Sequence, residues 1–176
     1  EFLNLGPGGA QKLFHAPRTR MNDRVEYDTR AIATCSLPLD RARSIAGATG
    51  AKVNDIVLTV IDAALHDYLD AKGENTRVPL VALCPMSLRE EGDATASTQA
   101  TALHISMGEP GAGIVERLRQ VVDSSRATKA EARAMSREAL LDFAVLMAGA
   151  LELADRTGLG RMISPSYNVL VSNVPG

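Results

Sequence analysis

The sequence of 176 residues lacks tryptophan and contains only three tyrosines and three phenylalanines. Proteins that bind single-stranded nucleic acid by stacking need aromatic side chains interleaved with basic ones, and this pattern is absent. The 19 lysines and arginines are outnumbered by 21 aspartates and glutamates, so the net charge is −2. Because no basic field attracts a phosphate backbone, the sequence predicts no nucleic-acid partner.

Cysteine is equally scarce, since Cys35 and Cys84 lie far apart in apolar runs and form no Cys-x-x-Cys pair. This spacing favours two buried, reduced thiols over a disulfide or a metal site. No secretory signal, with its basic stretch, apolar run and cleavage site, opens the chain. We therefore expect a cytoplasmic protein with no metal site. The chain starts at Glu1 without a methionine and stops abruptly at Gly176, which indicates a fragment of a longer protein.

The glycines at the start of the chain do not form a phosphate-binding loop. No Gly-Lys-Ser or Gly-Lys-Thr follows the stretch from Gly6 to Gly9, and no strand precedes it. With Pro17 and several charges, residues 1–28 are typical of a linker or an arm that crosses to another lobe. Residues 29–176 are long enough for one domain with its own core, whereas two full domains are not expected.

The remaining sequence shows both strand-like and helix-like hydrophobic patterns. Strands are predicted at residues 30–37, 78–86, 98–107 and 167–174, and helices at residues 40–48, 54–72, 114–134 and 137–155. The segment 78–86 is almost continuously apolar, which is typical of a strand covered on both faces. Together these elements predict a layered α/β domain with a mixed β-sheet and packed helices.

One helical segment, residues 139–153, is apolar on nearly all sides. It falls short of the roughly twenty apolar residues that a membrane-spanning helix needs. The segment is therefore predicted to be a buried helix. The alternative is that one of its sides lines an acyl tunnel or touches a bilayer.

The segment from Lys52 to Leu58 places two small polar residues at the start of a long apolar helix. Asn54 is the predicted helix cap, because its side chain can accept a hydrogen bond from a free backbone N–H. Asp55 beside it complements the positive end of the helix dipole. Both residues are also candidates for chemistry at a helix N-terminus.

The three histidines, His15, His66 and His104, have no histidine neighbours. His66 and Asp70 formally match His-x-x-x-Asp, but Ala71 stands where a glycine would let the backbone turn away from a catalytic base. His66 is therefore predicted to be a solvated residue on a helix. His104 falls in an alternating strand, where a structural role is favoured.

Four segments taken together resemble the C-terminal half of the bacterial wax ester synthase/acyl-CoA:diacylglycerol acyltransferase family. They run from Pro17 to Asn22, Lys52 to Leu58, Pro85 to Arg89, and Ser172 to Gly176. The resemblance implies the C-terminal lobe of a two-lobed, chloramphenicol-acetyltransferase-like fold, with the active site in a channel between the lobes.

The resemblance also implies a reaction in which a long-chain acyl group passes from acyl-CoA to a fatty alcohol or diacylglycerol. In this family the base lies in a His-His-x-x-x-Asp-Gly motif of the N-terminal half, where an imidazole takes the hydroxyl proton. That motif is missing here, so no catalytic residue is assigned to this chain, and its N-terminal lobe is its expected partner. Acyl-CoA is the expected substrate, and no further cofactor is predicted. Contact with the inner membrane or a lipid droplet is an open alternative to a purely cytoplasmic location.

Three pairs of residues are candidates for the channel. Asn54 and Asp55 could face a developing oxyanion or serve structure alone, and the negative charge of Asp55 favours structure. Arg89 follows an apolar strand and, with Ser87, is the candidate contact to a CoA phosphate; its alternative is a solvated charge. Ser172 and Asn173 either line the channel or satisfy a turn.

Two other functions stay open from the sequence. One is a non-catalytic interaction module of the same fold. The other is a condensation-type enzyme that takes acyl chains from a carrier protein. An intact histidine motif upstream of Glu1 would separate the acyltransferase from the first alternative. Binding of free acyl-CoA would separate it from the second.

Overall fold

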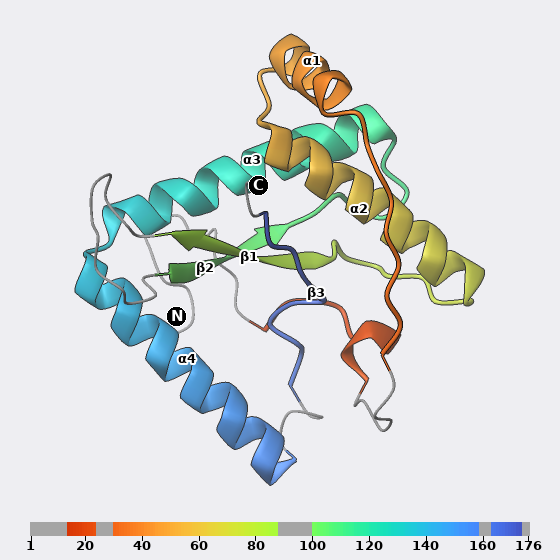
Figure 1. The fold of residues 1–176 in the computed structure, drawn as a ribbon. Helices are drawn as coiled ribbons and strands as arrows, with labels where there is room; N and C mark the ends of the chain where they lie inside the picture. Colours follow the sequence, from red (N-terminus) through yellow and green to blue (C-terminus); the bar gives the residue numbers. More distant parts are fainter. Residues whose placement is uncertain (1–13, 24–29, 88–99, 159–162, 174–176) are drawn as a thin grey trace.

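A computed structural model describes residues 14–23, 30–87, 100–158 and 163–173 of the chain. These residues form a mixed sheet with helices packed across it (Figure 1). In chain order the elements are a 3-10 turn η1 (Arg20–Asn22), helices α1 (Leu39–Thr49) and α2 (Val53–Ala71), strands β1 (Val81–Ser87) and β2 (Ala100–Ser106), helices α3 (Ile114–Ala134) and α4 (Arg137–Thr157), and strand β3 (Val169–Leu170).

The sheet has the strand order β2-β1-β3. Strand β1 runs antiparallel to β2, with Cys84 opposite Leu103, and parallel to β3, with Leu83 opposite Leu170. The predicted mixed sheet is therefore confirmed. The prediction of a last strand over 167–174 was too long, because only a short stretch of this edge pairs with β1 before the chain leaves the sheet.

The main core lies between one face of the β1–β2 pair and helices α2 and α3, which both cross the sheet in Figure 1. Alternate residues of both strands point to this face, as the period of two along a strand requires. Each fully buried leucine or isoleucine here contributes about 1.5–3 kcal/mol relative to an exposed one. The buried members are Leu80, Ala82, Cys84, Leu103, Ile105 and Met107 from the sheet region, Leu58 and Leu69 from α2, and Val121 and Ala132 from α3.

The strand predicted over 30–37 is wrong for the chain as the structure describes it. Residues 30–38 are neither helix nor strand and are exposed along their whole length, with Ile32 90% and Leu37 61% exposed. An apolar alternating segment becomes a strand only when a neighbouring strand pairs with it, and none of the described strands β1, β2 and β3 does so. Cys35 in this segment is exposed, so the prediction of two buried thiols holds for Cys84 alone.

The predicted helices are confirmed to within about two residues at their ends. Gly50 ends α1 with φ of +68°, a left-handed conformation that glycine adopts without a Cβ penalty. The prediction that residues 139–153 are buried is wrong for Val145, Leu146 and Leu153, which are exposed. Figure 1 shows α4 running away from the sheet, which leaves these turns uncovered by other described residues. Among the described residues no helix is long and apolar enough to cross a membrane.

A buried ion pair joins α2 to α3. Asp62 is fully buried, and its Oδ2 accepts hydrogen bonds from Arg117 Nη1 and, at 2.9 Å, from the Gly108 N–H. A buried charge is tolerated only when it is paired and hydrogen-bonded, and these donors meet that condition. Gly108 fits because it has no side chain, since an added Cβ would lie 2.9 Å from Asp62 Oδ2 and closer still to Arg117.

A hydrogen-bonded clasp fixes the 17–22 segment to the start of β3. The Asn168 side chain accepts from the Val81 N–H at 3.0 Å and donates to Pro17 O at 2.6 Å and to Asn22 Oδ1 at 2.9 Å. Asn22 in turn donates to Tyr167 O at 2.8 Å. The segment from Pro17 to Asn22 therefore has a structural role on the edge of the sheet.

Replacing Gly108 with alanine is expected to destabilise the chain, because the new methyl group must displace Arg117 or Asp62 from their ion pair. We expect a loss of about 1–3 kcal/mol in the free energy of unfolding, measured by urea denaturation. Gly47 in α1 is the matched control, since an added Cβ meets nothing within 4 Å there. Gly47→Ala should leave stability unchanged or raise it by up to about 1 kcal/mol. Equal stability of the two variants would contradict this account.

Candidate functional site

The N-terminus of α2 is organised by Asp55 and not, as predicted, by Asn54. The helix begins at Val53 with Lys52 as its cap residue, so Asn54 lies inside the first turn. Asp55 Oδ2 accepts a hydrogen bond from the Lys52 N–H at 2.8 Å. A side chain at the third helical position can reach back to the cap backbone in this way, and its charge also complements the helix dipole.

Asp55 is a buried acid near Cys84, which lies in the middle of β1. It is 3% exposed, and its Oδ1 has no hydrogen-bond partner among the described residues. Burial raises the pKa of the Cys84 thiol to about 11; the Lys129 ammonium opposes this shift and the Asp55 carboxylate adds to it. Lys129 Nζ donates to Ser125 Oγ at 2.8 Å. Asp55 at the start of α2 and Lys129 of α3 are therefore both close enough to Cys84, in the middle of β1, for their charges to act on its thiol.

The parallel pairing of β1 and β3 brings two predicted residues to the end of the sheet where β1 finishes. Because both strands run in the same direction, Ser172 and Asn173 leave the sheet at the end where β1 finishes at Ser87. Both are exposed. The Ser87 backbone lies in β1 but its side chain is not described, and Arg89 lies outside the described residues. The structure therefore places Ser172 and Asn173 at the end of the sheet where β1 finishes, places Asp55 near Cys84 in the middle of β1, and leaves the role of Arg89 a prediction.

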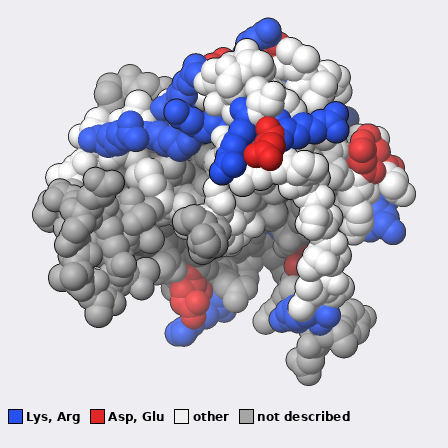
Figure 2. Space-filling model, turned by 45° about the horizontal axis from the view of Figure 1, so that its top comes forward, with Lys and Arg blue, Asp and Glu red and all other residues white. Residues whose placement is uncertain are grey.

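Lysine and arginine side chains gather on the face formed by α1 and α3 (Figure 2). Two of these arginines form ion pairs within their own helix, Arg43 with Asp40 and Arg119 with Glu116. Arg126 donates to Gly50 O at 2.8 Å, which ties α3 to the end of α1. Exposed charges of this kind attract a phosphate-bearing ligand over about one Debye length, roughly 10 Å at 0.1 M salt. Lys52, the cap residue of α2 and two residues before Asn54, is also exposed.

The histidines do not form a catalytic group. His66 is 8% exposed, so its prediction as a solvated residue is wrong; its Nε2 lies 3.4 Å from Asp62 Oδ1. His104 is buried in β2, and burial lowers its pKa. His15 is exposed. Within the described part of the chain, no three His, Cys, Asp or Glu side chains are placed to hold a metal ion.

Sequence reasoning missed Asp62 and Arg117, although a signal for Asp62 was available. Asp55, Asp62 and His66 share one helical stripe with the buried Leu58 and Leu69, following the three-four spacing of a buried face. A carboxylate on such a stripe requires a buried partner. The identity of that partner, on a helix more than fifty residues later, could not be read from local pattern.

Comparison with known proteins gives two family matches. The wax ester synthase/diacylglycerol acyltransferase catalytic domain matches residues 8–57, and the WS/DGAT C-terminal domain matches residues 97–176. A Mycobacterium tuberculosis protein named "probable diacyglycerol O-acyltransferase Tgs4" is 39% identical over 99% of this chain and 36% of its own length. A second M. tuberculosis protein with the same activity in its name is 32% identical over 93% of this chain and 36% of its own length.

A solved structure is also similar. The wax ester synthase/diacylglycerol acyltransferase of Marinobacter aquaeolei VT8 superposes with a TM-score of 0.63 and 28% identity, covering 78% of this chain and 30% of that one. The fold is thus that of a CoA-dependent acyltransferase lobe. The chain belongs to the wax ester synthase/diacylglycerol acyltransferase family and matches its C-terminal part. It spans about a third of the length of these relatives, 36% in both M. tuberculosis proteins.

Substitutions at the start of α2 distinguish the contribution of Asn54 to stability from that of Asp55. Asp55→Ala removes the hydrogen bond to the Lys52 N–H, and we expect it to cost about 0.5–2 kcal/mol in unfolding free energy. Asn54→Ala should cost less, because Asn54 is not the cap. Asp55→Asn keeps an acceptor oxygen and is the control, with a loss between the two. A larger loss of unfolding free energy for Asn54→Ala than for Asp55→Ala would show that Asn54 is the capping residue after all.

The two cysteines are expected to react at very different rates with iodoacetamide. At pH 8 the exposed Cys35 should be alkylated readily, whereas the buried Cys84, with its raised pKa, stays protonated and unmodified. Peptide mass spectrometry after a timed quench measures both sites in one sample. In urea the two should become equally reactive. Rapid modification of Cys84 in the native chain would show that the group around Asp55 and Lys129 is open to solvent.

Proposed function

We propose that this chain is the C-terminal lobe of an O-acyltransferase that moves a long-chain acyl group from acyl-CoA to a fatty alcohol or diacylglycerol. The observation that carries the proposal is the pair of family matches, one over residues 8–57 and the other over residues 97–176. The names of the mycobacterial and Marinobacter relatives support the same reaction. A non-catalytic module and a carrier-dependent condensation enzyme are not favoured by these names.

The proposed reaction needs a second lobe. Its histidine motif would supply the base that takes the hydroxyl proton while the oxygen attacks the thioester carbonyl and the CoA thiolate leaves. Residues 29–176 would form the lobe described here, and residues 1–28 the arm between lobes. Part of that arm, around Asn22, packs on the sheet edge of this lobe.

The exposed segment 30–38 is the proposed contact with the second lobe. This segment falls inside residues 8–57, which match the catalytic domain of the family. Other residues of that match, in α1 and at the start of α2, pack on the lobe described here. Ile32 and Leu37 in this segment, and Leu39 at the start of α1, are large apolar side chains exposed to water. The backbone of this segment, which joins no strand of the described sheet, suits an added strand on a neighbouring sheet.

This lobe would shape one wall of the channel. We assign to that wall the first turn of α2 with Asn54, the end of β1 with Ser87 and Arg89, and Ser172 and Asn173 after β3. Asp55 would act as a positioning residue that holds the turn. Arg89 would contact a CoA phosphate, helped by the basic face of α1 and α3 in Figure 2. A cytoplasmic location with peripheral lipid contact would suit such substrates.

The 176-residue chain alone is expected to show no turnover, because it has no residue suited to act as the family's base. The assay follows wax ester formed from labelled palmitoyl-CoA and hexadecanol, and then triacylglycerol formed from diacylglycerol. Co-expression with the histidine-bearing part of the same protein should restore product.

The variant Ile32→Glu tests the proposed contact with the second lobe, and it should prevent this restoration of product. Because Ile32 is exposed, its unfolding free energy should stay within about 0.5 kcal/mol of that of the unchanged chain. Product from the chain alone would overturn the two-lobe proposal. Product only with acyl groups on a carrier protein would transfer the assignment to the condensation-type enzymes.

A further inference from the structure

Helix α4 carries large apolar side chains that stay in water among the described residues. Val145 is 74% exposed, Leu146 69% and Leu153 62%. Residues seven or eight apart return to nearly the same side of a helix, so Leu153 lies between Val145 and Leu146 on one face. Figure 1 shows that this helix extends away from the sheet. An exposed apolar face of this kind indicates a contact with a partner.

The centre of this face is small and open. Ala148, Gly149 and Ala150 are all exposed, and an added Cβ at Gly149 would meet nothing within 4 Å. Glycine inside a helix is less favourable than alanine, and no described neighbour requires it here. Its missing side chain lets a second backbone approach closely.

Opposite charges lie at equal distances on either side of Gly149. Asp142 precedes it by seven residues and Arg156 follows it by seven. Seven residues make two helical turns, about 10 Å along the axis, so both charges share the face of Gly149. Arg156 Nε donates to Glu152 Oε1 at 2.8 Å, and its two Nη groups have no partner among the described residues. Asp142 is exposed and has no hydrogen-bond or ion-pair partner in the described part of the chain.

This pattern is complementary to itself when one copy of the helix is reversed. We propose that α4 packs antiparallel against α4 of a second copy of this chain, with a two-fold axis at Gly149. A two-fold axis brings a residue before it against the residue equally far after it in the other copy. Asp142 then meets Arg156 of the second copy, and Val145 meets Leu153, in both halves of the contact. A parallel pair would instead place Asp142 against Asp142, and these like charges would repel.

Other occupants fit this face less well. A lipid surface would take Asp142 and Glu152 out of water without a partner for either carboxylate, which costs free energy. The second lobe of the proposed enzyme has no need for charges arranged evenly about Gly149. Association of two copies goes beyond acyl transfer and does not depend on it, so each proposal can fail without the other.

The test is sedimentation equilibrium of the native 176-residue chain from about 1 to about 500 µM. A contact of one helix with one helix is at the small end of specific interfaces, so we expect a reversible dimer with a dissociation constant on the order of 10–100 µM. Val145→Glu places a charge in the apolar contact and should weaken the dimer by about 100-fold or more. Val115→Glu is the matched control, because Val115 is 70% exposed on α3 and lies outside this face. Circular dichroism checks that both variants keep the native fold.

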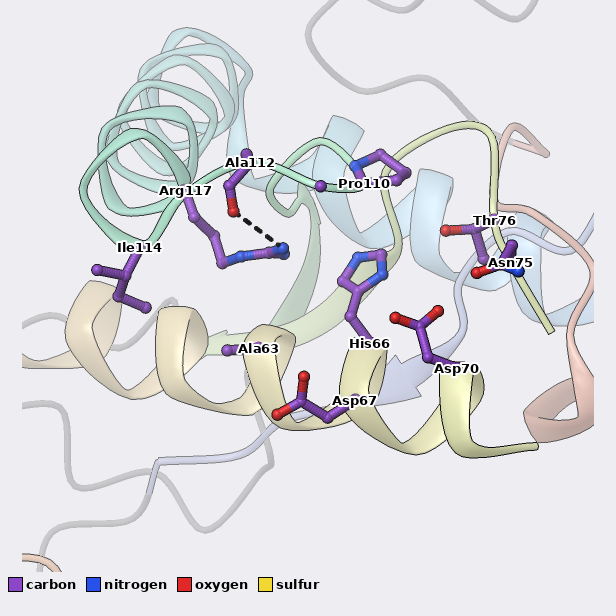
Figure 3. A pocket seen from close by; sticks show the side chains of 11 residues that line it. Ala63, His66, Asp67, Asp70, Asn75, Thr76, Pro110, Ala112, Ile114 and Arg117 are labelled. Atoms are coloured by element: carbon purple, nitrogen blue, oxygen red, sulfur yellow. Dashed lines mark hydrogen bonds between the residues drawn. The ribbon is translucent and has the colours of Figure 1, made fainter. Parts of the chain in front are cut away.

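Exchange of the two charges identifies the partner as a second copy. Asp142→Arg and Arg156→Asp should each weaken the dimer by about 5- to 30-fold, because both symmetric ion pairs become repulsive. The double variant Asp142→Arg/Arg156→Asp should return to within about threefold of the native affinity, since the two charges have only changed places. Asp67→Arg is the control for the change of charge, since Asp67 is exposed on α2 at the pocket drawn in Figure 3.

Three results would overturn the proposal. One is a chain that stays monomeric up to the highest concentration. Another is a dimer that Val145→Glu leaves unchanged or that the double variant does not recover, since the contact would then lie elsewhere. The third is a dimer that dissociates when the histidine-bearing part of the same protein is added, which would assign this face to the second lobe.

Discussion

The buried pair of Asp62 and Arg117 is the interaction on which the arrangement of this lobe depends. Moving two such charges out of water costs several kcal/mol per ion, and only close pairing with further hydrogen bonds repays it. The backbone of Gly108 supplies one of those bonds, which fixes the chain just after β2 against both helices. The pair therefore sets the angle at which α2 and α3 cover the sheet, and apolar packing of Leu58 and Val121 fills the space that results.

Local elements were predictable because their signals are local. The apolar stripe of α2, Gly50 after α1 and the continuous run of β1 each lie within a few residues of the structure that they specify. The failures share one cause, which is a distant partner. Among the described residues no strand pairs with the segment at Ile32 and none covers the exposed side chains of α4, while His66 is buried in a charge network that includes Arg117. No local pattern states which partner a residue will find.

The candidate site was only partly predictable for the same reason. The sequence placed Asn54 and Asp55 at a helix start, but which of them reaches the cap backbone depends on one residue of helix register. It could not show that Ser172 and Asn173 leave the sheet beside the end of β1, since this follows from a parallel pairing between segments far apart in the chain.

The clasp around Asn168 also constrains how the chain is made. Its partners Pro17 and Asn22 precede it by 151 and 146 residues. At a synthesis rate of roughly 5–20 residues per second, they wait many seconds for the asparagine that holds them. Until then β1 has one open edge at Val81, and open edges recruit other strands. A ribosome that stops shortly before Asn168 would release the preceding residues with this edge of β1 open, so the short segment around Asn168 protects the solubility of what is synthesised before it.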